Sequence, residues 1–252
     1  MTELLYLASM EAAYERTFRA RVLAVPPGGV VLDRTLFYPV GGGQPADHGV
    51  IRRSDGSNFR VVDVVRSGAS VLHRLDRPRA PAAAWQAGEE VVGEVDWARR
   101  FTHMRSHTAQ HLLSARAFAL TGVRTRKAVL GHGGGRIELE SAWPAEPSWS
   151  SLGEDLAGWV ARSLPVNLHF IPRVEYDRDP SPRSALVPLA PNVDPVRLVE
   201  IAPADRCPCG GTHVRNTSEI GEVDLAPPRR LADGAEELSF TLRSVATPTP
   251  SA

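Results

Sequence analysis

The pattern of the sequence changes near Asp96, and this change constrains the fold more than any other feature. Before it, short valine-rich segments alternate with Gly, Pro and Asp, which is typical of strands joined by turns. After it, residues 97–122 run without proline, carry apolar residues at Leu112, Ala115 and Ala119, and end on a glycine. This second pattern predicts a long helix. We therefore expect a β-rich first domain and a second domain that begins with this helix.

The expected strands of the first domain are short and closely spaced, which favours a small barrel. They cover residues 19–25, 29–33, 60–65, 70–75 and 89–96. The second domain mixes strands at 136–140, 166–174 and 196–202 with a helix at 150–163 and a proline-rich stretch at 179–195. The predicted fold class is therefore α+β. The predicted ranges are 1–97 for the β-barrel domain, 98–244 for the α+β domain and 245–252 for a disordered tail.

Composition narrows the class of protein. The chain has 252 residues, 42% of them hydrophobic, so it can bury a substantial core. No apolar run is long enough for a membrane helix, and acidic residues stand where a signal peptide needs basic ones, so we expect a cytoplasmic protein without a membrane partner. The formal net charge is +0, so any contact with nucleic acid must depend on a local patch. Nothing in the sequence indicates an obligate protein partner.

Two short motifs predict a metal site. In HTAQH, His107 and His111 share one face of the expected helix, one turn apart. In CPCGGTH, Cys209 and His213 flank a flexible Gly-Gly-Thr turn that can bring both side chains to one point. Three imidazoles and a thiolate form the nitrogen and sulfur set that Zn²⁺ prefers.

Alternatives remain for each part of this site. Histidines at this spacing also arise by coincidence, as His103 one turn earlier illustrates. Four protein ligands are more typical of a structural zinc than of a catalytic one, which keeps an open position. Cys207 competes with Cys209, because the single residue between them disfavours a disulfide and leaves both as ligands or inert thiols.

The same motifs carry a family resemblance. HTAQHLLSA from His107 and CGGTHVRNTSEIG from Cys209 resemble the editing domain of alanyl-tRNA synthetase and of its free-standing relatives, the AlaX proteins. The segment VVLDRTLFYPVGGGQPADHGVI, residues 30–51, is similar to the glycine-rich segment of the longer AlaX proteins. The resemblance implies a zinc-containing editing domain like those of alanyl- and threonyl-tRNA synthetases, with zinc on His107, His111, Cys209 and His213. No aminoacylation domain is recognisable.

The implied activity is hydrolysis, in trans, of the ester that joins a wrong amino acid to tRNA(Ala), chiefly serine and also glycine. An alanine pocket rejects glycine and serine poorly, because such differences are worth only a few kcal/mol, so a second sieve is needed. Since no Ser-His-Asp or Cys-His nucleophile is evident, direct attack by water is expected. Two roles of zinc stay open: it activates this water, or it only holds the amino acid while the terminal hydroxyl of the tRNA assists. No catalytic group is identified beyond the zinc-bound water.

Substrate contacts are expected in two places. We expect the editing site to select serine by its hydroxyl, with Thr212 or Gln44 as the hydrogen-bond partner. The GGGQ segment, Gly41, Gly42, Gly43 and Gln44, is interpreted either as a tight turn that needs positive φ or as a loop whose backbone amides approach the amino acid. A Gly-Gly-Gln loop also occurs in the peptide-release factors of translation, where flexible basic segments flank it. Here FYPV precedes the loop and PADHGVI follows it, which disfavours that interpretation.

Basic residues around the long helix are candidates for contact with tRNA phosphates, although a solvated helix face explains them equally well. They are Arg100, Arg105, Arg126 and Lys127. Two other functions are compatible with the metal motifs: a zinc-stabilised tRNA-binding module without hydrolysis, and a metal-dependent esterase acting on small molecules.

Overall fold

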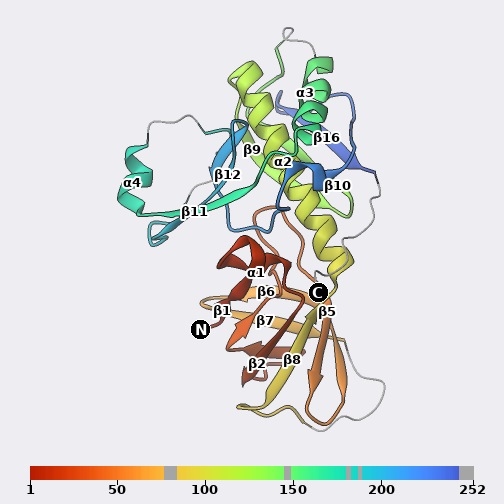
Figure 1. Ribbon diagram of the computed structural model, residues 1–252, viewed down its shortest axis with the longest axis vertical. Helices are drawn as coiled ribbons and strands as arrows, with labels where there is room; N and C mark the ends of the chain where they lie inside the picture. The colour runs from red at the N-terminus through yellow and green to blue at the C-terminus, as the bar shows by residue number, and fades with distance from the viewer. Residues whose placement is uncertain (77–83, 145–148, 180–182, 187–188, 244–252) are drawn as a thin grey trace. The chain divides into compact units, whose positions relative to one another are not determined.

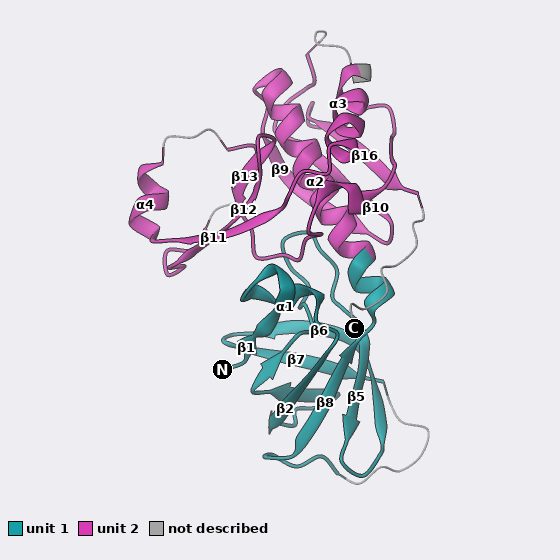
Figure 2. Ribbon diagram, in the orientation of Figure 1, with its two compact units in different colours: residues 1–101 teal, residues 102–252 magenta. Residues whose placement is uncertain are grey.

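The computed structural model describes residues 1–76, 84–144, 149–179, 183–186 and 189–243. The chain forms two compact units, Met1–Phe101 and Thr102–Ala252 (Figures 1 and 2). The division falls inside helix α2 (Trp97–Thr121), and the predicted domain ranges 1–97 and 98–244 stay predictions. The predicted tail at 245–252 lies outside the described residues. None of the helices in the described ranges combines the length and hydropathy needed to cross a membrane.

The first unit is built on antiparallel strands. These are β2 (Thr17–Ala24), β3 (Gly29–Leu32), β5 (Gly49–Arg53), β6 (Asn58–Ser67), β7 (Ser70–Leu75) and β8 (Glu90–Val95). They pair in the order β2-β3-β7-β6-β5-β8, and β8 returns to β2, which closes a barrel. Alternate residues of β2 point inward, as period-two patterning requires: Phe18, Ala20 and Val22 are buried in the barrel core.

Short elements complete the first unit. They are β1 (Glu3–Leu4), the 3-10 helix η1 (Leu5–Leu7), α1 (Met10–Tyr14) and β4 (Arg34–Thr35). Strands β1 and β4 pair in parallel, and the side chain of Ser9 caps α1 by accepting from the backbone of Ala12.

The second unit contains two antiparallel sheets. One has the order β14-β16-β10-β9, with β15 also paired to β16, and the other has the order β11-β12-β13. The strands are β9 (Thr125–Gly131), β10 (Gly134–Leu139), β11 (Asn167–Ile171), β12 (Val196–Ile201), β13 (Asp205–Pro208), β14 (Val223–Leu225), β15 (Arg229–Arg230) and β16 (Glu236–Leu242). Besides α2, the helices are α3 (Trp149–Ala161), α4 (Arg173–Arg178) and the 3-10 helix η2 (Thr217–Ile220). The mixed composition, dominated by sheet, agrees with the predicted α+β class.

One residue predicted to contact tRNA lies inside the first unit. Arg100 is fully buried, and its Nε donates to Asp47 Oδ2 over 2.9 Å while a terminal nitrogen donates to the carbonyl of Ala13 over 3.0 Å. Its other terminal nitrogen is bound to Leu36 O and to Asp47. Arg100 therefore belongs to the core of the first unit, because a buried guanidinium is tolerated only when it is paired and hydrogen-bonded.

His73 occupies the interior of the barrel with no exposed surface. Its Nδ1 lies 3.2 Å from the carbonyl of Val30, which can only accept, so Nδ1 carries the proton and Nε2 accepts from Thr35 Oγ1 over 2.8 Å. Burial disfavours the imidazolium and lowers the pKa of His73 from 6.5 to about 4.

Replacing Asp47 with Ala should lower the free energy of unfolding by about 3–5 kcal/mol, because Arg100 is then left buried without its counter-ion. Urea unfolding measures the loss. Arg21→Ala is the matched control, since Arg21 and Glu90 form an exposed pair at 2.7 Å, and such a pair is worth about 1 kcal/mol or less. Equal losses in the two variants would contradict a core role for the Arg100–Asp47 pair.

The buried His73 should make the stability of the first unit sensitive to acid. The unfolded chain takes up a proton on this imidazole near pH 6.5, whereas the folded chain does so only near pH 4. The contribution of neutral His73 to the free energy of unfolding is therefore complete above pH 6.5 and is lost as the pH falls to about 4. The free energy of unfolding changes by about 3 kcal/mol over this range. Urea unfolding at pH 7 and pH 4 should show a smaller loss in His73→Gln than in the wild type. His169→Gln, at an exposed position, should keep the wild-type pH dependence.

Candidate metal centre

Helix α2 positions two of the candidate ligands. His107 and His111 lie one turn apart on the helix and are both buried, with ring centroids 5.1 Å apart. The residues around them, Ala109, Leu112 and Leu113, are buried as well. The imidazoles are therefore held on a packed helix and not on a mobile loop.

The other two candidates follow strand β13. The register of β13 against β12 pairs Cys207 with Val199, and the amide of Cys209 donates to the carbonyl of Arg197 over 3.1 Å just after the strand ends. The chain then turns through Gly210 and Gly211 and reaches His213, which is 1% exposed. This turn brings the second pair of side chains to α2.

The four predicted ligands converge. One candidate atom from each of His107, His111, Cys209 and His213 lies within 4.8 Å of the others. Cys209 Sγ is 3.5 Å from His107 Nε2 and 3.3 Å from His213 Nε2. Three nitrogens and one sulfur at these separations fit a single tetrahedral transition-metal ion.

The protonation of the cluster suits a cation. Burial alone raises the pKa of the Cys209 thiol, but the adjacent imidazoles of His107 and His213 outweigh it and hold this pKa well below its usual range. The amide of Gly211 also donates to Cys209 Sγ over 3.3 Å. Burial, together with His107, holds the pKa of His213 well below 6.5. The thiolate of Cys209 and the neutral imidazole of His213 are the forms of these side chains that bind a metal.

A second group of possible ligands shares His111. His111 Nδ1 lies 2.9 Å from Asp205 Oδ2 and 3.3 Å from Cys207 Sγ, and all three residues are buried. Burial raises the pKa of Cys207 to about 12, so this sulfur is a neutral thiol. Asp205 is not among the residues predicted from the sequence; its acidic side chain two positions before the Cys-Pro-Cys string is the available signal.

The GGGQ segment forms a tight hairpin in the first unit. Gly41 and Gln44 exchange two backbone hydrogen bonds of 3.1 and 2.9 Å, while Gly42 and Gly43 have φ of 55° and 82°. The Tyr38 hydroxyl donates to Gly41 O over 2.8 Å. The interpretation as a turn that needs positive φ thus describes its geometry. Substrate contact by this hairpin, and by the buried Thr212 of the second unit, stays a prediction.

The remaining basic candidates differ in exposure. Arg105 is 4% exposed and donates to the carbonyls of Ile220 and Arg243 over 2.6–2.9 Å, so its guanidinium is engaged within the second unit and its contact with tRNA stays a prediction. Arg126 and Lys127 lie at the surface, paired with Asp233 at 2.7 Å and Glu138 at 3.0 Å. Surface pairs of this kind are weak, so both side chains stay candidates.

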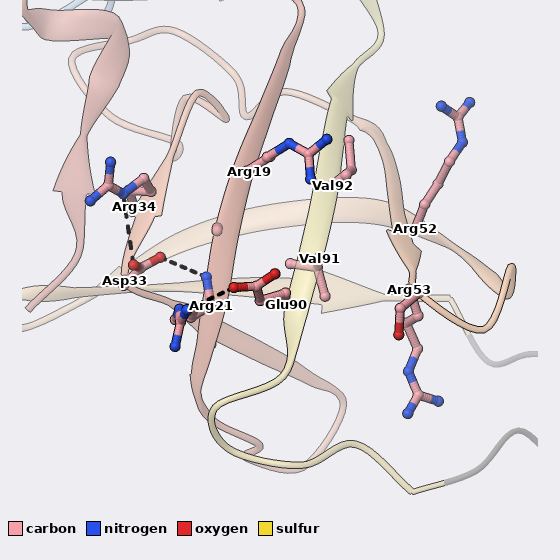
Figure 3. A pocket seen from close by; sticks show the side chains of 11 residues that line it. Arg19, Arg21, Asp33, Arg34, Arg52, Arg53, Glu90, Val91 and Val92 are labelled. Atoms are coloured by element: carbon pink, nitrogen blue, oxygen red, sulfur yellow. Dashed lines mark hydrogen bonds and ion pairs between the residues drawn. The ribbon is translucent and has the colours of Figure 1, made fainter.

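An arginine-lined pocket of about 560 Å³ lies on the first unit (Figure 3). Four of its five lining arginines are paired with acids: Arg21 with Glu90 at 2.7 Å, Arg34 with Asp33 at 3.7 Å, Arg52 with Glu94 and Arg53 with Glu89. Most of the positive charge of the pocket is therefore balanced locally, which weakens the electrostatic attraction of an anion.

The comparisons with known proteins agree with the two-part organisation. Residues 6–99 match the family described as tRNA synthetases class II (A), and residues 196–234 match the threonyl and alanyl tRNA synthetase second additional domain. An alanine–tRNA ligase of Pyrobaculum calidifontis is 38% identical over 92% of this chain, but the match spans only 26% of that ligase.

Shorter relatives match from end to end. The alanyl-tRNA editing protein AlaX-M of Methanosarcina barkeri is 33% identical over 96% of this chain and 99% of its own length. The AlaX-M protein of Methanosarcina acetivorans gives the same identity and coverage. Because the match at this identity spans essentially both whole chains, this protein belongs to the AlaX-M family of alanyl-tRNA editing proteins.

Proposed function

We propose that this chain is a zinc-dependent aminoacyl-tRNA hydrolase that removes the wrong amino acid, chiefly serine and also glycine, from mischarged tRNA(Ala) in trans. The observation that carries the proposal is the convergence of His107, His111, Cys209 and His213 in a chain that matches AlaX-M proteins over 96% of its length. The proposed activity also locates the chain in the cytoplasm, where tRNA is charged.

Zinc is the proposed ion because its preferred donors are imidazole nitrogen and thiolate sulfur in tetrahedral geometry. When bound, zinc supplies a Lewis acid that can polarise an ester carbonyl or make a water molecule more acidic. The chain's own contribution is a buried, preorganised set of donors: Cys209 as a thiolate, and His107, His111 and His213 as nitrogen ligands. No other catalytic group is assigned.

Selection of serine over alanine requires a partner for the serine hydroxyl. Thr212 is buried between the ligands Cys209 and His213, which makes its side chain our candidate. Gln44 is the second candidate, on the GGGQ hairpin. A site built to hydrogen-bond the serine hydroxyl discriminates against alanine more strongly than a steric sieve can.

Two glycines support the idea that substrate approaches the backbone closely. A Cβ at Gly210 would meet no atom within 4 Å, and one at Gly41 would meet its nearest atoms only at 3.9 Å. Neither glycine needs positive φ. Packing within the protein therefore leaves space beside the backbone at both positions, which an approaching substrate could use. For tRNA itself, the exposed Arg126 and Lys127 are the proposed phosphate contacts.

The first test is deacylation of Ser-tRNA(Ala), Gly-tRNA(Ala) and Ala-tRNA(Ala) by the purified protein. We expect rapid loss of serine, loss of glycine, and survival of the alanyl ester. His111→Ala, or removal of zinc by a chelator, should reduce the serine rate by more than about 100-fold. His169→Ala, which removes an exposed histidine paired with Glu200, should retain full activity.

The outcomes separate the competing functions. If the zinc-loaded protein binds tRNA(Ala) without deacylating any of the three, it is a binding module and the hydrolase proposal is wrong. Hydrolysis of small esters at a rate that tRNA does not increase would instead indicate an esterase.

The glycine argument predicts a selective effect of added methyl groups. Gly210→Ala and Gly41→Ala should leave the melting temperature within about 2 °C, because each Cβ has room. Both should lower kcat/KM for Ser-tRNA(Ala) by about 10-fold or more if substrate comes close to the backbone. Gly56 lies in a surface turn with φ of 84°, with no candidate site beside it. Gly56→Ala therefore shows the effect of backbone strain alone. Unchanged deacylation by the Gly210 and Gly41 variants would remove these glycines from the substrate site.

A further inference from the structure

We propose that Asp205 and Thr108 are positioning residues, which hold His111 and His213 with Nε2 facing the metal by engaging Nδ1 of each ring. This inference rests on the metal site of the proposed function, but it concerns how the ligands are oriented. Neither residue is itself a ligand in this arrangement.

Thr108 determines the tautomer of His213. Its hydroxyl donates to the carbonyl of Met104 over 2.9 Å, one turn back on α2, so its single proton is used. The same oxygen lies 3.1 Å from His213 Nδ1 and must therefore accept a proton from it. The amide of Val214 also donates to this oxygen over 3.2 Å. With Nδ1 protonated, His213 presents the lone pair of Nε2, the atom 3.3 Å from Cys209 Sγ.

Asp205 has the corresponding role for His111. Its Oδ2 is 2.9 Å from His111 Nδ1, and an ionised carboxylate can only accept, so Nδ1 carries the proton. The other oxygen, Oδ1, accepts from Ser184 Oγ over 3.3 Å. Both oxygens are engaged, and the Asp205 side chain is only 4% exposed. A carboxylate behind a metal-binding imidazole fixes the ring and makes it a stronger donor.

This arrangement excludes an ion in the group His111, Asp205 and Cys207. The nitrogen of His111 that faces this group is Nδ1, and a nitrogen that donates its proton to a carboxylate has no lone pair for a metal. The two groups of possible ligands share His111 and cannot both use it. The hydrogen bonds favour the His107, His111, Cys209 and His213 set, with Cys207 as a buried neighbour.

The charges favour the same assignment. The thiolate of Cys209 and the carboxylate of Asp205 together balance the two positive charges of a divalent ion inside the second unit. A buried charge is costly unless it is compensated, so removal of Asp205 weakens the site even though the carboxylate does not touch the metal.

The test measures metal binding by the full-length protein in the absence of tRNA. Zinc affinity is determined by competition with a chromophoric chelator for the wild type, Asp205→Ala, Asp205→Asn and Thr108→Val. We expect affinity about 10–100-fold weaker for Asp205→Ala and about 10-fold weaker for Thr108→Val. Asp205→Asn, which keeps an acceptor but loses the charge, should be intermediate. Thr108→Ser, which keeps the hydroxyl, should restore wild-type affinity.

Controls separate orientation from folding. Asp224→Ala removes an exposed carboxylate of the same unit, paired with Arg243 at 3.1 Å, and should bind zinc normally. Where an alanine variant fails to fold by circular dichroism, the Asn and Ser variants decide the result. Substitution with Co²⁺ adds a spectroscopic readout: the thiolate charge-transfer band should persist in Cys207→Ser and disappear in Cys209→Ser, and the ligand-field bands should shift in the Asp205 variants.

Wild-type zinc affinity in folded Asp205→Ala and Thr108→Val would overturn the proposal. Loss of the thiolate band in Cys207→Ser, with retention in Cys209→Ser, would also overturn it by placing the metal in the other group. Because zinc binding is measured without substrate, a protein that binds zinc as expected but does not deacylate tRNA refutes the proposed function and leaves this inference intact.

Discussion

Helix α2 carries many buried polar side chains, and the partners of several of them lie far away in the sequence of the unit concerned. In the first unit, Arg100 is neutralised by Asp47 and by main-chain carbonyls. In the second, Arg105 is bound by the carbonyl of Ile220, Thr108 by His213, and His111 by Asp205. An unpaired buried polar group costs several kcal/mol, so these contacts fix which loops may pack against the helix. The candidate metal centre is one consequence of this requirement.

The pairing of buried polar groups also holds the candidate metal centre rigid. Each of two imidazoles is held by a residue that has no freedom of its own: Thr108 is fixed by the carbonyl of Met104, and Asp205 is held between His111 and Ser184. Cys209 is fixed by the amide of Gly211 and by the pairing of its own amide with Arg197. Ligands held in this way need little reorganisation when an ion binds, which raises affinity for ions of the matching geometry.

Local spacing was enough to predict which side chains converge as candidate ligands, whereas contacts between distant residues could not be predicted. His107 and His111 follow from helical periodicity, and Cys209 and His213 from a short turn, so each pair needs only neighbouring residues. The burial of Arg100 and Arg105 depends on partners 53 and 115 positions away, which no local pattern reveals. Strands β9 and β16 were missed for the same reason: Arg126, Lys127, Glu236 and Glu237 interrupt their apolar pattern, and their charges are matched by residues on paired strands and turns. The role of Asp205 likewise appears only when β13 is placed beside α2.

A centre with four protein ligands is ordinarily structural, so a catalytic role needs a route by which substrate reaches the ion. His107, His111 and His213 are at most 5% exposed, whereas Cys209 is only partly buried. Beside it, Gly210 faces open space. The partners that fix Nδ1 of His111 and His213 prevent these rings from swinging aside to open a position. A substrate ester would therefore have to approach on the side of Cys209 and Gly210. A centre with four protein ligands is compatible with the proposed hydrolysis if substrate approaches from this side.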